Sequence, residues 1–230
     1  MTALEELEPK IFDDRFKWSD IDKDKALTDT RVLDLVREAC LIESYFAVYT
    51  GKMLQLFWYD VRATSMYTIE AFEAYTHFHC LRRYLDIVGY CPVADMEVVA
   101  LRRNDVDKTY DDEARELVNF MATEHFASHF FGALADKSAE PVLTAILKRM
   151  SAEEVIHARF AFDLLAERLA EGKITREDIL SHAKDFRHVG AYVLPKVSNV
   201  EEDNVKIING FGNMVEKLTG VSLTEFMAMA

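Results

Sequence analysis

The chain has 230 residues, of which 50% are hydrophobic and 29% charged, and its formal net charge is −13. This size allows one large domain with a buried core, and the acidic balance argues against nucleic acid as a partner, because phosphate binding requires a basic face. No apolar run approaches the roughly 20 residues that cross a bilayer, and the acidic, mixed first thirty residues do not resemble a signal peptide.

The amino-terminal region is expected to be irregular, and the rest of the chain to be helical. Residues 1 to about 27 are highly charged, with Phe12, Phe16 and Trp18 as expected anchors onto the body of the protein. Beyond this region, the scarcity of helix breakers, with only 8 glycines and 4 prolines in the whole chain, favours long helices over a many-turned β fold.

Two long helices are predicted in the first half of the chain. The first begins near Thr28 or Thr30, either of which could cap it, and its apolar periodicity continues to about Leu56. The second runs from about residue 63 to 87 and stops before Gly89. A short helix and a polar connection are expected in residues 93–111.

Two further long helices and a helical tail follow. The third long helix is predicted over residues 112–135, and the fourth opens at Pro141 and ends at Gly172. Thr175 and Asp178 form a capping-box pattern, which predicts a short helix. A last helix is expected after Pro195. Four long helices without strand alternation predict an all-α fold, a four-helix bundle with additional short helices.

The cysteines are few and widely spaced. Cys40, Cys80 and Cys91 are odd in number and lie mostly in apolar surroundings. This usage is typical of buried free thiols in a reducing compartment, so we expect a cytoplasmic protein.

The stretch SAEEVIHARFAF places charged groups among apolar residues of the fourth helix. Glu154 and His157 lie about 60° apart on one helical face, with Val155 and Ile156 to either side, and Phe160 and Phe162 are expected to continue the buried stripe. A buried charged pair is costly unless a helix cap, an ion pair or a metal compensates it.

Similar mid-helix acids recur in a regular order on the other three long helices. The candidates are Glu43 on the first helix, Glu70, Glu73 and His77 on the second, Glu124 on the third, and Glu154 with His157 on the fourth. Glu43 and Glu73 are 30 residues apart, as are Glu124 and Glu154, so two similar hairpins would bring these acids to one depth. One acid followed by acid plus histidine, twice, is the requirement of a dimetal carboxylate site in a four-helix bundle.

Carboxylates and imidazoles together suit iron or manganese. We therefore expect two iron ions, with manganese or a mixed manganese–iron pair as the alternatives, and buried acids whose charge the metals compensate.

Four segments resemble the soluble acyl-carrier-protein desaturases of the ferritin-like diiron superfamily. Residues 139–162, AEPVLTAILKRMSAEEVIHARFAF, are similar to the fourth-helix signature of that family, and residues 77–85, HFHCLRRYL, to its second ligand helix. Residues 41–49, LIESYFAVY, and 124–132, EHFASHFFG, resemble the first and third ligand segments. The resemblance covers roughly residues 35–165.

The resemblance implies a ferritin-like fold over residues 1–230, with a metal-binding core at about 28–172 and carboxyl-terminal helices at 175–230. It also implies dioxygen as co-substrate, an acyl-like substrate on an acyl carrier protein, an electron donor such as ferredoxin, and a homodimer. Three pairs of basic residues are candidates for docking an acidic carrier: Arg82–Arg83, Arg102–Arg103 and Lys148–Arg149.

Two positions depart from the family pattern. Ala74 stands three residues before His77, where the family has a ligand acid. Glu73, about 40° from His77 around the helix, and Glu70, about 20° away, are the candidate replacements. Ala127 stands three residues after Glu124, where the family tends to have a threonine near the dioxygen pocket.

Three functions therefore compete. The leading prediction is a dimetal oxidase or oxygenase that acts on an apolar, acyl-like substrate with dioxygen and an external electron donor. The alternatives are a ferritin-like iron-binding protein without an organic substrate and a partner-binding scaffold whose metal site is degenerate at Ala74. A substrate cavity would favour the enzyme, and five aromatic residues are candidates to line one: Phe46, Tyr49, Phe72, Phe126 and Phe130.

Overall fold

The structure is a computed structural model that describes residues 16–187 and 201–229. Over these two ranges it contains nine α-helices, one short 3₁₀ helix and no β-strand, so the predicted all-α bundle is confirmed. Phe12 and Pro195, to which the sequence assigned an anchor and a helix boundary, lie outside the described residues.

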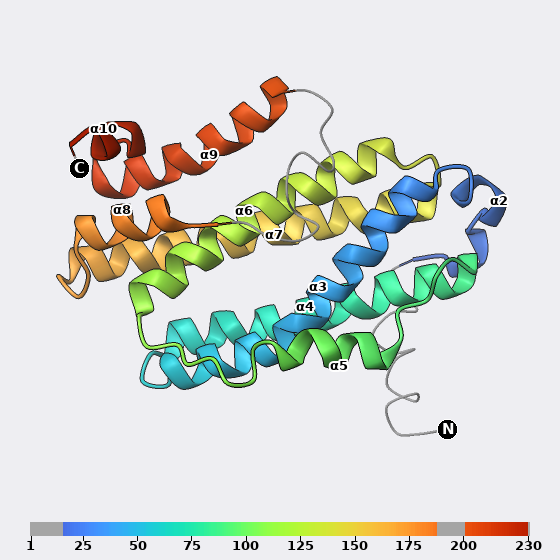
Figure 1. The fold of residues 1–230 in the computed structure, drawn as a ribbon, viewed down its shortest axis with the longest axis horizontal. Helices are drawn as coiled ribbons and strands as arrows, with labels where there is room; N and C mark the ends of the chain where they lie inside the picture. The colour runs from blue at the N-terminus through green and yellow to red at the C-terminus, as the bar shows by residue number, and fades with distance from the viewer. Residues whose placement is uncertain (1–15, 188–200, 230) are drawn as a thin grey trace.

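Four long helices form two antiparallel hairpins that pack together lengthwise (Figure 1). The helices are α3 (Thr30–Leu56), α4 (Val61–Val88), α6 (Glu113–Lys137) and α7 (Pro141–Ala170). Helices α3 and α4 form one hairpin and α6 and α7 the other, while α4 packs on α7 and α3 on α6 across the bundle. All four predicted long helices are therefore present, with ends within a few residues of those expected.

Acidic side chains begin each long helix. Asp29, Asp60 and Asp112 each accept a hydrogen bond from a backbone N–H in the first turn, and Glu140 accepts two, from Val142 and Leu143. Such caps satisfy amide groups that have no partner within the helix. The expectation that Thr28 or Thr30 caps the first helix was wrong, because the Asp29 side chain reaches the Val32 amide.

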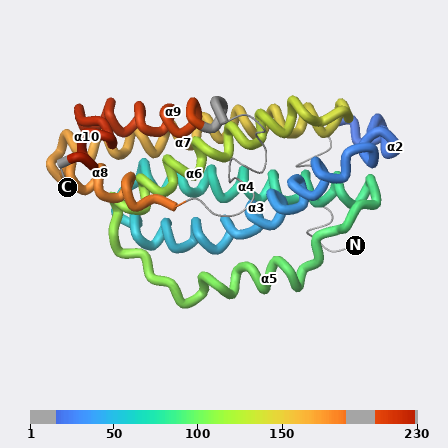
Figure 2. Tube along the Cα trace, turned by 45° about the horizontal axis from the view of Figure 1, so that its top comes forward, coloured from blue at the N-terminus to red at the C-terminus, as the bar shows by residue number. Residues whose placement is uncertain are grey.

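The shorter elements surround the bundle (Figure 2). They are η1 (Trp18–Asp20), α2 (Lys23–Ala26), α5 (Asp95–Arg103), α8 (Arg176–Asp185), α9 (Glu201–Thr219) and α10 (Leu223–Met229). Helix α5 lies along α3, whereas α9 lies along α6 and α7 on the other side of the molecule. The predicted capping box of Thr175 and Asp178 is present at the start of α8.

The apolar core consists of two clusters that occupy opposite ends of the bundle. On α3, Ala39 and Cys40 belong to one cluster and Phe46 and Tyr49 to the other, so Glu43 lies between them. The candidate ligands of the other helices are similarly flanked by the two clusters. The polar site is therefore a layer at the middle of the helices, enclosed by apolar side chains at both ends.

Two expectations about exposure need correction. Phe160 does not continue a buried stripe, because its side chain is 36% exposed, and Val155 and Ile156, to either side of the acid and histidine, are 56% and 54% exposed. Cys40 and Cys80 are buried free thiols as expected, but Cys91 is exposed. Within the described residues, no helix has the length and apolar character that a membrane span requires.

Candidate metal centre

The structure brings six of the seven predicted ligand residues into two adjoining groups of three. One group contains Glu43, His77 and Glu154, and the other contains Glu70, Glu124 and His157. Within each group, one oxygen or nitrogen ligand atom from every residue lies within 4.8 Å of the others, and all six residues are buried. Each group thus offers two carboxylates and one imidazole to a metal ion.

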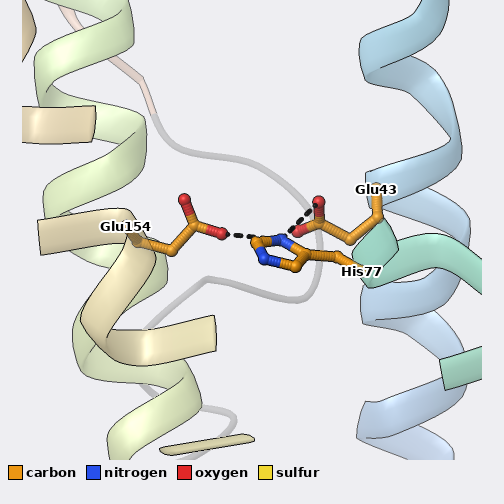
Figure 3. A group of neighbouring side chains, drawn as sticks. All are labelled: Glu43, His77 and Glu154. Atoms are coloured by element: carbon orange, nitrogen blue, oxygen red, sulfur yellow. Dashed lines mark ion pairs between the residues drawn. The ribbon is translucent and has the colours of Figure 1, made fainter. Parts of the chain in front are cut away.

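The Glu154 carboxylate connects the two groups. Its Oε1 atom lies 3.1 Å from Nδ1 of His77, and its Oε2 atom lies 2.7 Å from Nδ1 of His157. Figure 3 shows the His77 ring between Glu154 on α7 and Glu43 on α3, whose Oε2 atom lies 3.4 Å from Nδ1. With one oxygen directed to each group, this carboxylate has the geometry of a bridging ligand.

Each histidine also contacts a third acid through Nε2, the ring nitrogen that faces away from the two groups. Nε2 of His77 lies 2.9 Å from Oε2 of Glu153, and Nε2 of His157 lies 2.5 Å from Oε2 of Glu73. A metal-binding histidine usually donates its other ring N–H to a carboxylate, which fixes the tautomer and the orientation of the ring. The two histidines therefore present Nδ1 to the centre, and Glu73 and Glu153 hold them in that orientation.

The choice between Glu70 and Glu73 follows from how α4 faces α7. Glu70 lies about two turns before His77 on the same face of α4, so both side chains enter the layer between the hairpins. Glu73 reaches His157 from the partly exposed side of the α4–α7 contact. Ala74, where the family pattern expects an acid, is buried in the apolar core. Glu70, and not Glu73, therefore joins Glu124 and His157 in a group that could hold a metal ion.

Glu153 is the residue of the site that sequence reasoning missed. Its carboxylate contacts His77 on α4 and accepts a hydrogen bond from Arg149, which lies on α7 with Glu153. No spacing within α7 signals this role, because the contact crosses between helices.

The residues fit a pair of metal ions. Glu124 Oε1 is buried and has no hydrogen-bond partner among the described residues, whereas Glu70 Oε2 lies 2.7 Å from Nδ1 of His157 and His77 Nδ1 lies 3.1 Å from Oε1 of Glu154. A buried oxygen without a partner is costly unless something binds its lone pairs. Two divalent cations would balance the charge of the four carboxylates, and the mixed oxygen and imidazole donors suit iron and manganese.

Without metal, the site is expected to hold protons. Burial disfavours the charge on the buried imidazole of His77, but the carboxylates of Glu154, Glu153 and Glu43 outweigh it and raise its pKa well above the usual value. Burial raises the pKa of Glu124 and Glu70, reinforced by neighbouring carboxylates. Protons on these groups compete with metal for the same lone pairs.

A matched pair of variants on α4 separates the ligand from the orienting acid. We expect Glu70→Gln to lose about one of two ions per chain, because it removes a carboxylate from one group. Glu73→Gln should keep both ions and weaken binding by about 10- to 100-fold, as changes to residues that orient a ligand do. Elemental analysis and metal titration measure both effects. Loss of an ion in Glu73→Gln alone would show that Glu73 is the ligand.

A cavity of about 440 Å³ lies between α3 and α6 and reaches Glu124. Its apolar wall includes Ile42, Phe46 and Phe120, and Tyr49 lies beside them. Of the five aromatic candidates, Phe46 and Tyr49 line this cavity, whereas Phe126 and Phe130 pack in the core and Phe72 is 48% exposed. The volume falls in the range of small-molecule sites.

A second cavity, of about 340 Å³, reaches Glu43 from the side of α5. Arg82 of α4 and Arg102 of α5 both line it, so one residue from each of two predicted basic pairs lies here, and Asp95, 2.8 Å from Arg82, lines the same cavity. The third pair lies on α7, where Arg149 is engaged by Glu153. The two cavities lie on opposite sides of α3 and lead to different groups of the centre.

Comparisons with protein-family models, with curated proteins and with solved structures find no match for this chain. The resemblance to acyl-carrier-protein desaturases therefore stays a prediction from the sequence. The assignment of a candidate site depends on the geometry of the side chains, which form two adjoining buried groups that could each hold a metal ion.

Proposed function

We propose that this chain is a dimetal oxidase or oxygenase that binds two iron ions, with manganese or a mixed pair as alternatives. Its substrate is an apolar, acyl-like molecule held in the cavity beside Glu124, and dioxygen is the oxidant. The observation that carries the proposal is the pair of adjoining buried groups joined by Glu154, each with two carboxylates and one imidazole. When bound, two such ions supply electrons and open positions for dioxygen activation.

The residues of the chain have separate roles in this proposal. Glu43, Glu70, Glu124 and Glu154 hold the ions together with His77 and His157. Glu73 and Glu153 orient the imidazoles by accepting from Nε2. These outer acids do not need to contact substrate.

The cavity is what favours an enzyme over a storage protein. More of its exposed wall is apolar than polar, which suits an apolar substrate near the centre. Its charged lining residues are Asp105, Lys108, Glu116, Glu124 and Arg187. Thr123 also lines this cavity and places a hydroxyl next to Glu124 in the sequence, whereas Ala127 is buried in the core. An iron-storage function requires no such cavity.

The electrons that dioxygen reduction requires come from an external donor such as ferredoxin in this proposal. Acidic partners, whether a donor or an acyl carrier protein, would be attracted to the face where Arg82 and Arg102 meet. That attraction has to overcome the net charge of −13, so it depends on local rather than overall charge.

The test is product formation by the reduced, iron-loaded protein. Fatty acids and their carrier thioesters of increasing chain length are supplied with dioxygen, and products are identified by mass. We expect added substrate to accelerate oxygen consumption. We also expect the product mass to differ from the substrate mass by the atoms gained or lost in one defined oxidation. Leu101→Trp, which narrows the cavity from α5, should shift the preference to shorter chains without changing the iron content.

Met96→Trp is the matched control, because Met96 lies on the same helix and is 83% exposed. It should leave both the chain-length preference and the iron content as in the original chain. If iron binds but no chain length yields product or accelerates oxygen consumption, iron binding without organic chemistry becomes the better account. If no iron binds, the helical scaffold with a degenerate site is favoured.

A further inference from the structure

Three tyrosines form a continuous group of rings in the wall of the Glu124 cavity. The Tyr49 ring stacks on that of Tyr45 at a centroid distance of 6.1 Å, and it meets the Tyr110 ring edge-on at 5.8 Å. Tyr45 and Tyr49 lie on α3, and Tyr110 precedes α6. Tyr49 is buried, whereas Tyr45 and Tyr110 are partly exposed, so the rings connect the cavity interior with the protein surface.

The rings lie close to two carboxylates. Glu116 of α6 lines the same cavity as Tyr49, and burial, with the charge of Glu116 as a smaller cause, raises the pKa of the Tyr49 hydroxyl. The Tyr45 and Tyr110 hydroxyls lie 3.1 Å apart, and Tyr110 donates to Oδ1 of Asp105 over 2.7 Å. A phenol that loses an electron becomes a strong acid, so a hydrogen-bonded base is what allows a tyrosine to be oxidised to a neutral radical.

The two carboxylates are suited to accept these protons. Burial disfavours the charge on Asp105, but hydrogen bonds from Tyr110, Lys108 and Tyr45 outweigh it and lower its pKa, so it is an ionised acceptor. Burial raises the pKa of Glu116 to about 7, so near neutral pH it both accepts and returns a proton. Lys108 lies 3.0 Å from Asp105 and balances its charge.

We propose that Tyr49 and Tyr110, with Tyr45 beside them, carry oxidising equivalents from the metal centre to the protein surface when the cavity holds no substrate. This proposal rests on the proposed function, because dioxygen at the metal pair is the oxidant. The tyrosines would protect the protein, because a centre oxidised without substrate would otherwise attack its own ligands. Electron transfer between rings in contact is fast, because tunnelling falls steeply with distance.

Each transfer balances in electrons and protons. Tyr49 gives one electron to the oxidised centre and its phenolic proton to Glu116, which leaves a neutral Tyr49 radical. Tyr110 then gives one electron to Tyr49 and its own proton to Asp105, while Tyr49 recovers its proton from Glu116. An external one-electron reductant such as ascorbate finally reduces the Tyr110 radical, which recovers its proton from Asp105.

The experiment follows tyrosine radicals rather than turnover. Iron-loaded protein is reduced, mixed with dioxygen without substrate, and frozen for electron paramagnetic resonance. We expect a tyrosyl signal that narrows when the protein contains ring-deuterated tyrosine and that disappears when ascorbate is added before freezing. Tyr49→Phe should abolish the signal, and Tyr110→Phe should make it insensitive to ascorbate by confining the radical to the buried end.

Tyr67→Phe is the matched control. Its ring lies 6.4 Å from that of Tyr49 and is fully buried, but its hydroxyl has no hydrogen-bond partner among the described residues. The control should retain the signal. Iron binding and oxygen uptake without any tyrosyl signal would overturn the relay and leave the proposed function standing. A signal that survives Tyr49→Phe would also overturn it, and a chain that binds no iron would overturn both proposals.

Discussion

Replacing Glu154 by glutamine is expected to abolish binding of both metal ions, from about two per chain to nearly none. The reason is its position between the two groups: one oxygen lies 3.1 Å from Nδ1 of His77 and the other 2.7 Å from Nδ1 of His157. The amide keeps the volume of the side chain but loses the charge and one acceptor, so neither ion retains a full set of ligands. Elemental analysis after iron reconstitution measures the effect.

Glu167→Gln provides the matched control for this variant. Glu167 is on the same helix and pairs with Arg62 at the surface, 2.6 Å away, so its replacement should leave two ions bound. Circular dichroism of both variants establishes that the helices are intact, which separates ligand loss from unfolding. Retention of two ions in Glu154→Gln would contradict the bridging role.

Metal binding is expected to release protons and to reverse the pH dependence of stability. In the metal-free protein, the pKa values of His77, His157, Glu70 and Glu124 are all raised. For the two acids, burial is the main cause. For the two histidines, burial lowers the pKa, but the neighbouring carboxylates outweigh it. A group with a raised pKa stabilises the fold fully below its unfolded pKa, and this contribution falls as pH rises through its folded pKa. Metal-free protein should therefore become less stable above about pH 6.5, the unfolded pKa of histidine.

Glu154 behaves in the opposite sense. Burial disfavours its charge, but His77 and His157 lower its pKa. The stability that Glu154 contributes is therefore present above its unfolded pKa and is lost as pH falls.

Bound ions replace the protons of the other four groups. We expect on the order of two to four protons released per chain near pH 7, and about 2.7 kcal/mol of added stability for each bound ion at an ion concentration of 100 Kd.

Calorimetry in buffers of different ionisation enthalpy counts the released protons, and thermal unfolding across pH measures stability. His79→Asn is the control, because His79 is also on α4 and partly buried, with a pKa that burial lowers to about 4, but it belongs to neither metal group. It should leave the proton count unchanged. Metal binding without proton release, or metal-free protein that becomes more stable as pH rises above 6.5, would contradict the protonated metal-free site.

The helices and most of the candidate ligands could be predicted from sequence because both depend on local pattern. Helix-forming residues with few breakers dictate long helices, and Gly89, in a left-handed conformation with φ of 77°, ends α4 near the predicted position. An acid inside an apolar stretch stands out because burying it alone is costly. That signal selected Glu43, Glu124 and Glu154, which the structure brings together with both histidines.

The tertiary structure decided what depends on contacts between helices. Glu70 and Glu73 both lie near the face of His77, so periodicity alone could not rank them, and it was the contact of α4 with α7 that directed Glu73 to the outer nitrogen of His157. The role of Glu153 arises from the same contact. A helix's own sequence records which residues share a face, but not which neighbour covers that face.

The same limit explains the misplaced apolar residues and the unseen cavities. Val155, Ile156 and Phe160 satisfy an apolar pattern, yet the helices beside α7 leave them partly exposed. The cavities between α3 and its two neighbours depend on how side chains from separate helices fill space, and the chain order contains no record of that packing. Local energetics therefore determined the helices and the presence of buried acids, while the packing of helices against one another determined which acids meet, which histidine each one holds, and where a substrate has room.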